Sequence, residues 1–205
     1  MAVIAPIANF GILEKLYVPG EAGVTAGNLL GSPEQLQVAI ALFFMVVILD
    51  VVVAWALYLF LKRVSKALSL TTAILRWIYS LVLLYALFSL VEVSRLSGSG
   101  PEQLAELAPA LFDRFLRIWD FGLGIFGLHL MLLGILVYRA AGLPRFLGIL
   151  VLIAGAGYLV DFTGKMISSS YTFEISIFTF IGEVLLIFWL IIPGLRKSKM
   201  SASEL

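Results

Sequence analysis

The feature that most constrains this chain is an apolar run from Trp119 to Arg139, WDFGLGIFGLHLMLLGILVYR. A helix of this length can cross the hydrocarbon core of a bilayer, which takes roughly 20 apolar residues. The run nevertheless carries Asp120 near one end and His129, the single histidine of the protein, near its middle. Because ionisable side chains are costly in hydrocarbon, those found there are candidates for a functional site.

Similar apolar runs fill most of the sequence. The chain is 61% hydrophobic and 13% charged, with a mean hydropathy of +1.07, far from the balance of a soluble domain. We therefore predict an all-α, polytopic transmembrane helix bundle that forms a single membrane domain over residues 1–205. The six expected spans cover residues 2–18, 35–61, 67–93, 116–139, 145–164 and 175–192, and the first is the shortest.

The stretch before the fourth span is amphipathic. Apolar residues such as Leu104, Leu111 and Phe115 recur there at helical spacing, with charged residues between them. A straight helix from Pro101 to Arg139 would be about 58 Å long, well beyond a bilayer. The pattern therefore predicts an amphipathic helix at the membrane interface over residues 101–115, with a bend at Pro109.

The basic residues predict the orientation. One side of the expected topology carries Lys62, Arg63, Lys66, Arg139, Arg145, Arg196, Lys197 and Lys199. The positive-inside rule places this side in the cytoplasm, together with both termini. A net charge of +1 argues against a nucleic-acid surface. The absence of cysteine excludes disulfides, thiolate metal sites, iron–sulfur clusters and cysteine nucleophiles.

Helical rise converts the distance from the basic markers into depth. The midplane layer holds residues about 15–20 Å from the basic side, namely Asp50, Arg76, His129 and Glu183. An outer tier contains Asp120 and Asp161, with Glu92 beyond them. Arg76 is the one fixed cation of the midplane layer, so we expect Asp50 on the adjacent helix to pair with it. Glu183 and His129 then remain as titrating groups of a proton relay or ligand site.

Two interpretations of this layer stay open. One is a structural polar network that fixes helix packing, and the other is a site for a ligand, proton or ion. No catalytic residue and no metal site are predicted, because no nucleophile with its base and no metal-ligand spacing is recognisable, which disfavours an enzyme. His129 alone could hold a pigment or haem iron axially. The cofactor is otherwise unknown.

Three glycines of the fourth span spell the pattern G-x-G-x-x-G. Gly122, Gly124 and Gly127 lack the preceding strand of a dinucleotide-binding unit. We interpret them as small residues that permit close helix approach or a cavity. Gly148, Gly155 and Gly157 of the fifth span are interpreted in the same way.

Several segments together carry a family resemblance: LYVPGEAGVTAGNLL, ILDVVVAWALYLFLKRVSKALSLTTAILRWI, DFGLGIFGLHLMLLGILVYRAAGLPRFLGILVLIAGAGYLVD and GEVLLIFWLIIPGLR. The chain resembles the bacterial integral-membrane family catalogued as domain of unknown function 4386, whose members have a longer first helix. The family pattern falls on Asp50, Arg76, Asp120, His129, Arg139, Pro144, Asp161 and Glu183. The resemblance implies the bacterial cytoplasmic (inner) membrane and strengthens the site, while the family name carries no activity.

The leading hypothesis is a membrane protein whose polar cavity near the midplane binds or relays a small solute, proton or ion. The alternative is an accessory or structural subunit of a larger membrane complex, in contact with a pigment, haem or quinone. Expected partners are membrane lipids and either further copies of the chain or other subunits. Purification from native membranes separates the two: a small homo-oligomer favours the first hypothesis, and stoichiometric co-purification favours the second.

Overall fold

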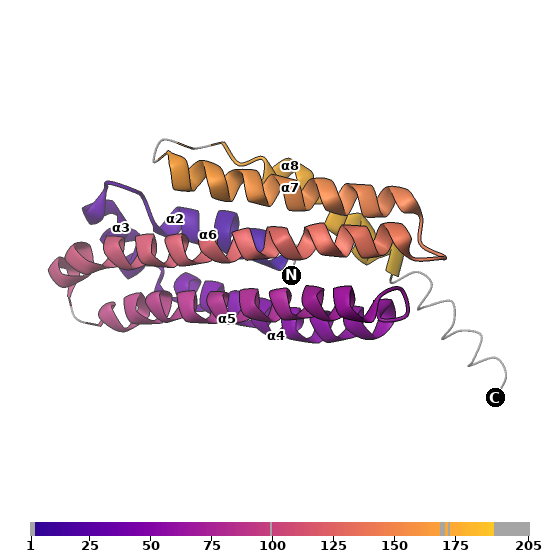
Figure 1. Ribbon diagram of the computed structural model, residues 1–205. Coiled ribbons are helices and arrows are strands. Elements are labelled where there is room, and N and C mark those ends of the chain that lie inside the picture. The colour runs from indigo at the N-terminus through magenta and orange to yellow at the C-terminus, as the bar shows by residue number, and fades with distance from the viewer. Residues whose placement is uncertain (1–2, 99, 169–170, 172, 191–205) are drawn as a thin grey trace, which may run out of the picture.

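Figure 1 shows the computed structural model of the chain, which describes residues 3–98, 100–168, 171 and 173–190. Within these residues every regular element is a helix. The prediction of an all-α bundle is confirmed.

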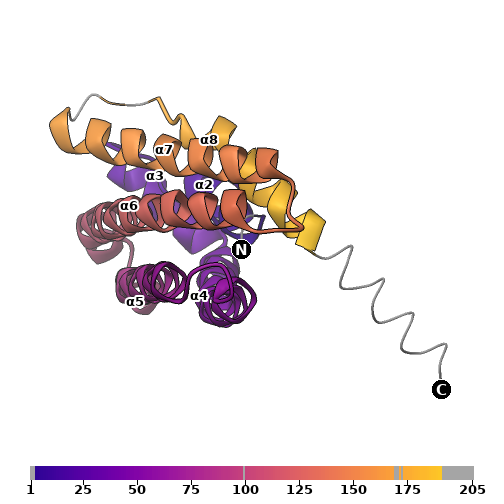
Figure 2. The same ribbon diagram turned by 45° about the vertical axis from the view of Figure 1, so that its right-hand side comes forward.

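Four helices are long and apolar enough to cross a membrane: α4 (Pro33–Leu61), α5 (Lys66–Leu96), α6 (Pro101–Arg139) and α7 (Arg145–Ile167). They run side by side along the bundle, with α6 packed between α5 and α7 and with α4 beside α5 (Figures 1 and 2). The described residues thus account for four of the six expected spans. The full count and the cytoplasmic placement of the termini stay predictions.

The remaining helices are shorter. The N-terminal segment contains α1 (Ile4–Pro6), the π-helix η1 (Ile7–Leu13) and α2 (Glu14–Leu16). It is about 20 Å long and packs on α4. Helix α3 (Ala22–Gly31) packs mainly on α6. Helix α8 (Ser176–Thr179) lies on α7.

The apolar segment that begins with α8 is described as far as Leu190, over about 22 Å of helix. The N-terminal segment is shorter than a hydrocarbon core of about 30 Å. Residue 2, residues 191–192 of the last expected span and the basic tail at 196–199 lie outside the described residues.

The residues expected to form an interfacial helix, 101–115, belong to a longer helix, and their place at the membrane interface stays a prediction. These residues continue without a break into residues 116–139 as the single helix α6, which contains Pro109. Their apolar face is covered by protein: Phe112 stacks on Tyr17 with ring centroids 4.9 Å apart, and the Tyr17 hydroxyl donates to Asp113 Oδ1 at 2.6 Å. The amphipathic pattern therefore reflects packing against the N-terminal segment and α3.

Glycines bring α6 and α7 into backbone contact. A Cβ atom on Gly155 would lie 2.8 Å from the carbonyl oxygen of Gly127, and one on Gly148 would lie 2.8 Å from that of Gly134. On the other side of α6, a Cβ on Gly122 would lie 3.2 Å from Val82 of α5. The expected role of the small residues in close helix approach is confirmed, since no larger side chain fits there without displacing a neighbour.

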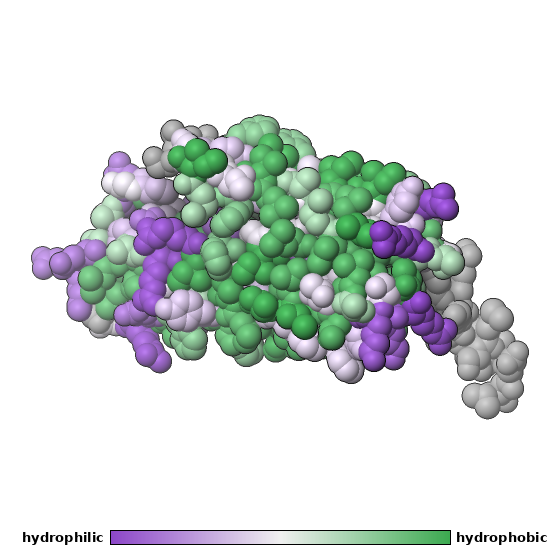
Figure 3. All heavy atoms as spheres, in the orientation of Figure 1, coloured by the Kyte–Doolittle hydropathy of each residue, from purple (hydrophilic) through white to green (hydrophobic). Residues whose placement is uncertain are grey.

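The surface is divided into bands. Figure 3 shows hydrophilic residues gathered at the two ends of the bundle and an apolar band between them. Large side chains that are exposed on the molecule include Phe44, Val52, Phe88, Phe121 and Phe188. A continuous apolar band of this kind is the surface that lipid chains cover.

Candidate functional site

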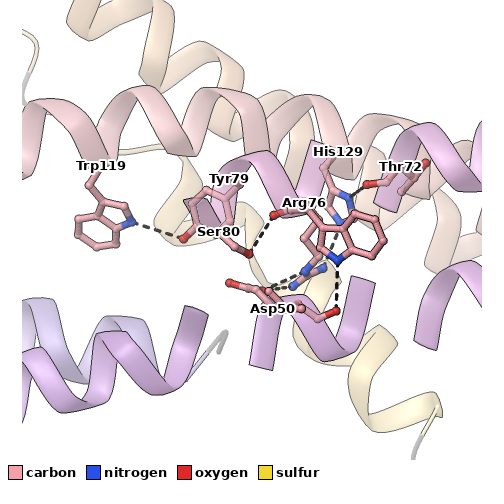
Figure 4. Close-up of polar contacts among 9 residues, drawn as sticks. Asp50, Thr72, Arg76, Tyr79, Ser80, Trp119 and His129 are labelled. Carbon is pink, nitrogen blue, oxygen red and sulfur yellow. Dashed lines mark hydrogen bonds and ion pairs between the residues drawn. The ribbon is translucent and has the colours of Figure 1, made fainter. Parts of the chain in front are cut away.

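The centre of the bundle holds a buried ion pair. Asp50 of α4 and Arg76 of α5 are 1% and 2% exposed. The Nε and Nη2 atoms of Arg76 donate to Asp50 Oδ1 at 2.9 and 2.7 Å (Figure 4). The pairing expected from the depth of the two residues is confirmed.

His129 of α6 extends this pair into a network. Its Nε2 lies 3.0 Å from Nη1 of Arg76, and its Nδ1 lies 2.8 Å from the backbone oxygen of Thr72 (Figure 4). A carbonyl oxygen only accepts and a guanidinium only donates. These partners assign the neutral tautomer with the proton on Nδ1.

This arrangement changes the expected role of His129. The residue is fully buried and both of its ring nitrogens are engaged. A second ring proton would point at the Arg76 guanidinium, and a haem iron would need a free ring nitrogen. The geometry therefore favours a positioning role over a titrating or iron-binding role.

A cavity of about 720 Å³ lies between the long helices and the two shorter segments. Asp50, Tyr79 and Glu183 line one part of it, whereas Asp120, Lys165 and Glu174 line another. Ala5, Asn9 and Phe10 contribute the wall from the N-terminal segment. His129 is not among the lining residues. The cavity thus joins part of the expected midplane layer with part of the outer tier.

Glu183 is a buried acid on the cavity wall, and one of its two carboxylate oxygens has no hydrogen-bond partner among the described residues. The residue is 7% exposed, and the oxygen in question is Oε1. Tyr158 of α7 hydrogen-bonds to the Glu183 carboxyl group, and the charges of Asp50 of α4 and Arg76 of α5 act on it. Buried carboxylate oxygens are normally hydrogen-bonded, so the free Oε1 is the exception in this wall.

The outer part of the cavity carries a different ion cluster. The Lys165 ammonium contacts Asp120 Oδ1 and Glu174 Oε1, both at 2.8 Å, and the three side chains are 28–33% exposed. Ion pairs with this exposure each contribute at most about 1 kcal/mol to stability. One ammonium serves two carboxylates, which leaves this part of the wall net negative.

Asp161 has a structural role, apart from the cavity. Its Oδ1 accepts the Tyr171 hydroxyl at 2.7 Å and the Ile175 amide at 2.9 Å, while Oδ2 accepts the Ser176 amide at 2.7 Å. The hydrogen bond to this carboxylate raises the pKa of Tyr171, which lies outside the spanning helices. Asp161 therefore fixes the start of α8 on α7.

The outer tier is not one cluster. Asp120 faces the cavity, Asp161 anchors α8, and Glu92 is exposed on α5. Glu92 therefore lies apart from Asp120 and Asp161, at an exposed position near the end of α5.

Removing the Asp161 carboxylate should free the start of α8. In Asp161→Ala, two backbone amides lose their acceptor, an effect of about 1–3 kcal/mol on local opening. We expect hydrogen exchange at the Ile175 and Ser176 amides to become roughly tenfold to a hundredfold faster by mass spectrometry. Thr163→Ala is the control, because that exposed hydroxyl bonds only to carbonyls of its own helix. Unchanged exchange in Asp161→Ala would contradict the anchoring role.

Sequence reasoning missed several polar residues of the cavity wall, among them Tyr79, Tyr158 and Lys165. Helical spacing contained a signal for these three. Tyr79 follows Arg76 by three positions, and Tyr158 and Lys165 stand three before and four after Asp161. Residues at such spacings share a helix face, so each lies on the same side as an ionisable residue that was already a candidate.

Comparisons with known proteins identify the family of the chain. The sequence profile of the family described as domain of unknown function (DUF4386) matches residues 1–194. A protein of Archaeoglobus fulgidus, described as uncharacterized, is 37% identical over 157 residues, which cover 77% of this chain and 84% of the relative. No solved structure matches the chain. With its four membrane-length helices, the chain belongs to the family described as domain of unknown function 4386.

Proposed function

We propose that this protein relays a proton through the cavity between its helices. Glu183 is the group that takes up and releases the proton. The observation that carries the proposal is the free Oε1 of Glu183 on the wall of a cavity of about 720 Å³.

A purely structural network accounts less well for this residue. Asp50, Arg76 and His129 satisfy one another, as expected of groups that fix helix packing. Glu183 has a hydrogen bond with Tyr158 but no ion pair among the described residues, although an acid buried without a counter-charge destabilises a fold. A buried acid with this cost is expected to serve the cavity.

Asp50 and Arg76 have a supporting part. Arg76 places a fixed positive charge behind the Asp50 carboxylate, so the pair adds little net charge beside Glu183. The Tyr158 and Tyr79 side chains provide hydroxyl groups in the same cavity. Hydroxyls both donate and accept hydrogen bonds, which suits the passage of a proton along the wall toward Asp120.

The experiment is a proton-flux measurement in reconstituted vesicles with an internal pH dye, driven by a potassium diffusion potential. Wild-type protein should acidify or alkalinise the lumen several times faster than empty vesicles. Glu183→Gln should reduce the rate to that of empty vesicles, and Glu183→Asp should keep part of it. Circular dichroism melting and gel filtration test whether each variant is folded.

Glu92→Gln is the matched control, because it removes the same charge from an exposed position on α5. Its flux should equal that of the wild type. A wild type no faster than empty vesicles would overturn the proposal, and so would a folded Glu183→Gln that retains the wild-type rate.

A further inference from the structure

The cavity wall carries more acidic than basic side chains. Its lining carboxylates are Glu14, Asp50, Asp120, Glu174 and Glu183. Lys165 is the one cationic residue among the described lining residues. Since Asp50 is paired with Arg76 and Lys165 is shared by two acids, the wall keeps an excess of negative charge that includes the free carboxylate oxygen of Glu183.

Eight further described residues of the wall carry aromatic rings, including Tyr79, Phe126 and Tyr158, and most of the others are aliphatic. The faces of such rings attract cations. The Phe126 ring already contacts a cation of the protein, because the Arg76 guanidinium carbon lies 5.2 Å from its ring centroid.

We infer that the cavity binds a monovalent organic cation, an ammonium group on an apolar body. The Glu183 carboxylate pairs with the charge, and the aromatic rings cover the body. This inference rests on the proposed function, because it takes the same Glu183 carboxyl group as the functional group of the cavity.

Other ligand classes fit less well. An anion would meet the carboxylates, and the Lys165 ammonium that could receive it is occupied twice. A divalent metal ion needs several oxygen ligands close together, and the described residues hold no group of three that could supply them. The volume of about 720 Å³ lies in the range of small-molecule sites.

The test is calorimetric titration of the full-length protein in detergent with phenyltrimethylammonium. The neutral isostere tert-butylbenzene differs from this cation by one atom, carbon in place of charged nitrogen. We expect saturable binding of the cation, at least tenfold weaker binding of the isostere, and at least tenfold weaker cation binding by Glu183→Gln. Glu92→Gln should bind the cation as the wild type does, and blank micelles correct for partitioning.

Two outcomes would overturn the inference: no saturable binding of the cation, or equal affinity for the cation and its isostere. Because the second comparison uses wild-type protein alone, it holds even where Glu183→Gln does not fold. A folded Glu183→Gln with wild-type affinity would also overturn it. Binding needs no proton movement, so the flux measurement and the titration can fail separately. Flux without cation binding would support the proton relay and overturn the cation site. Cation binding without flux would support the cation site and overturn the proton relay.

Discussion

Replacing Asp50 with leucine is expected to lower the free energy of unfolding by about 3–5 kcal/mol. The variant leaves the Arg76 guanidinium, which is 2% exposed, without the carboxylate that accepts from its Nε and Nη2 atoms. Removing the carboxylate that pairs with a buried guanidinium is among the largest single destabilising effects. Unfolding with denaturant in detergent micelles, followed by circular dichroism, measures the loss.

The double variant Asp50→Leu with Arg76→Leu should recover much of this loss. It removes both buried charges, and an apolar replacement of a buried ion pair is often close to neutral. His129 Nε2 then loses the donor from Arg76, so roughly 1–3 kcal/mol of the loss should remain. If the effects of the two single variants simply add in the double variant, the residues are not coupled and the pair is not the organising contact. Glu92→Leu on the exposed face serves as the control, with a change within about 0.5 kcal/mol.

The sequence was sufficient to predict this ion pair because depth along a helix is a linear quantity. Counting residues from the basic ends placed Asp50 and Arg76 at one level on helices joined by a short turn. The same arithmetic placed His129 and Glu183 in that layer, yet it carried no information on direction around the helix axis. Both ring nitrogens of His129 hydrogen-bond to residues of α5, whereas Glu183 lines the cavity.

Other features depend on contacts between distant segments. The amphipathic sequence pattern of residues 101–115 would be the same whether lipid headgroups or another part of the protein covered its apolar face. Tyr17 and α3 provide that cover here, and they lie far from Phe112 in sequence. The role of Asp161 could not be predicted for a similar reason. Its hydrogen-bond donors are the backbone amides of Ile175 and Ser176, which follow α7 after a loop.

The contact between α6 and α7 leads to the second large effect. Gly155→Ala is expected to lower the free energy of unfolding by about 2–3 kcal/mol, although alanine favours a helix over glycine. The new Cβ would lie 2.8 Å from both the Gly127 oxygen and the Met131 nitrogen. These are backbone atoms, so relief requires the two helices to separate. Loss of that close approach removes packing across the whole α6–α7 contact, the interaction that holds helices together in lipid.

The control for this substitution is Gly27→Ala on α3. A Cβ there meets nothing within 4 Å, so the helix preference for alanine acts alone and should raise the unfolding free energy by up to about 1 kcal/mol. The two variants add the same methyl group to a helix glycine and are expected to shift stability in opposite directions. Thermal or denaturant unfolding of both in one detergent makes the comparison. Equal shifts would mean that α7 is held by its side chains, and that the glycines of α6 and α7 are not needed for the backbone contact.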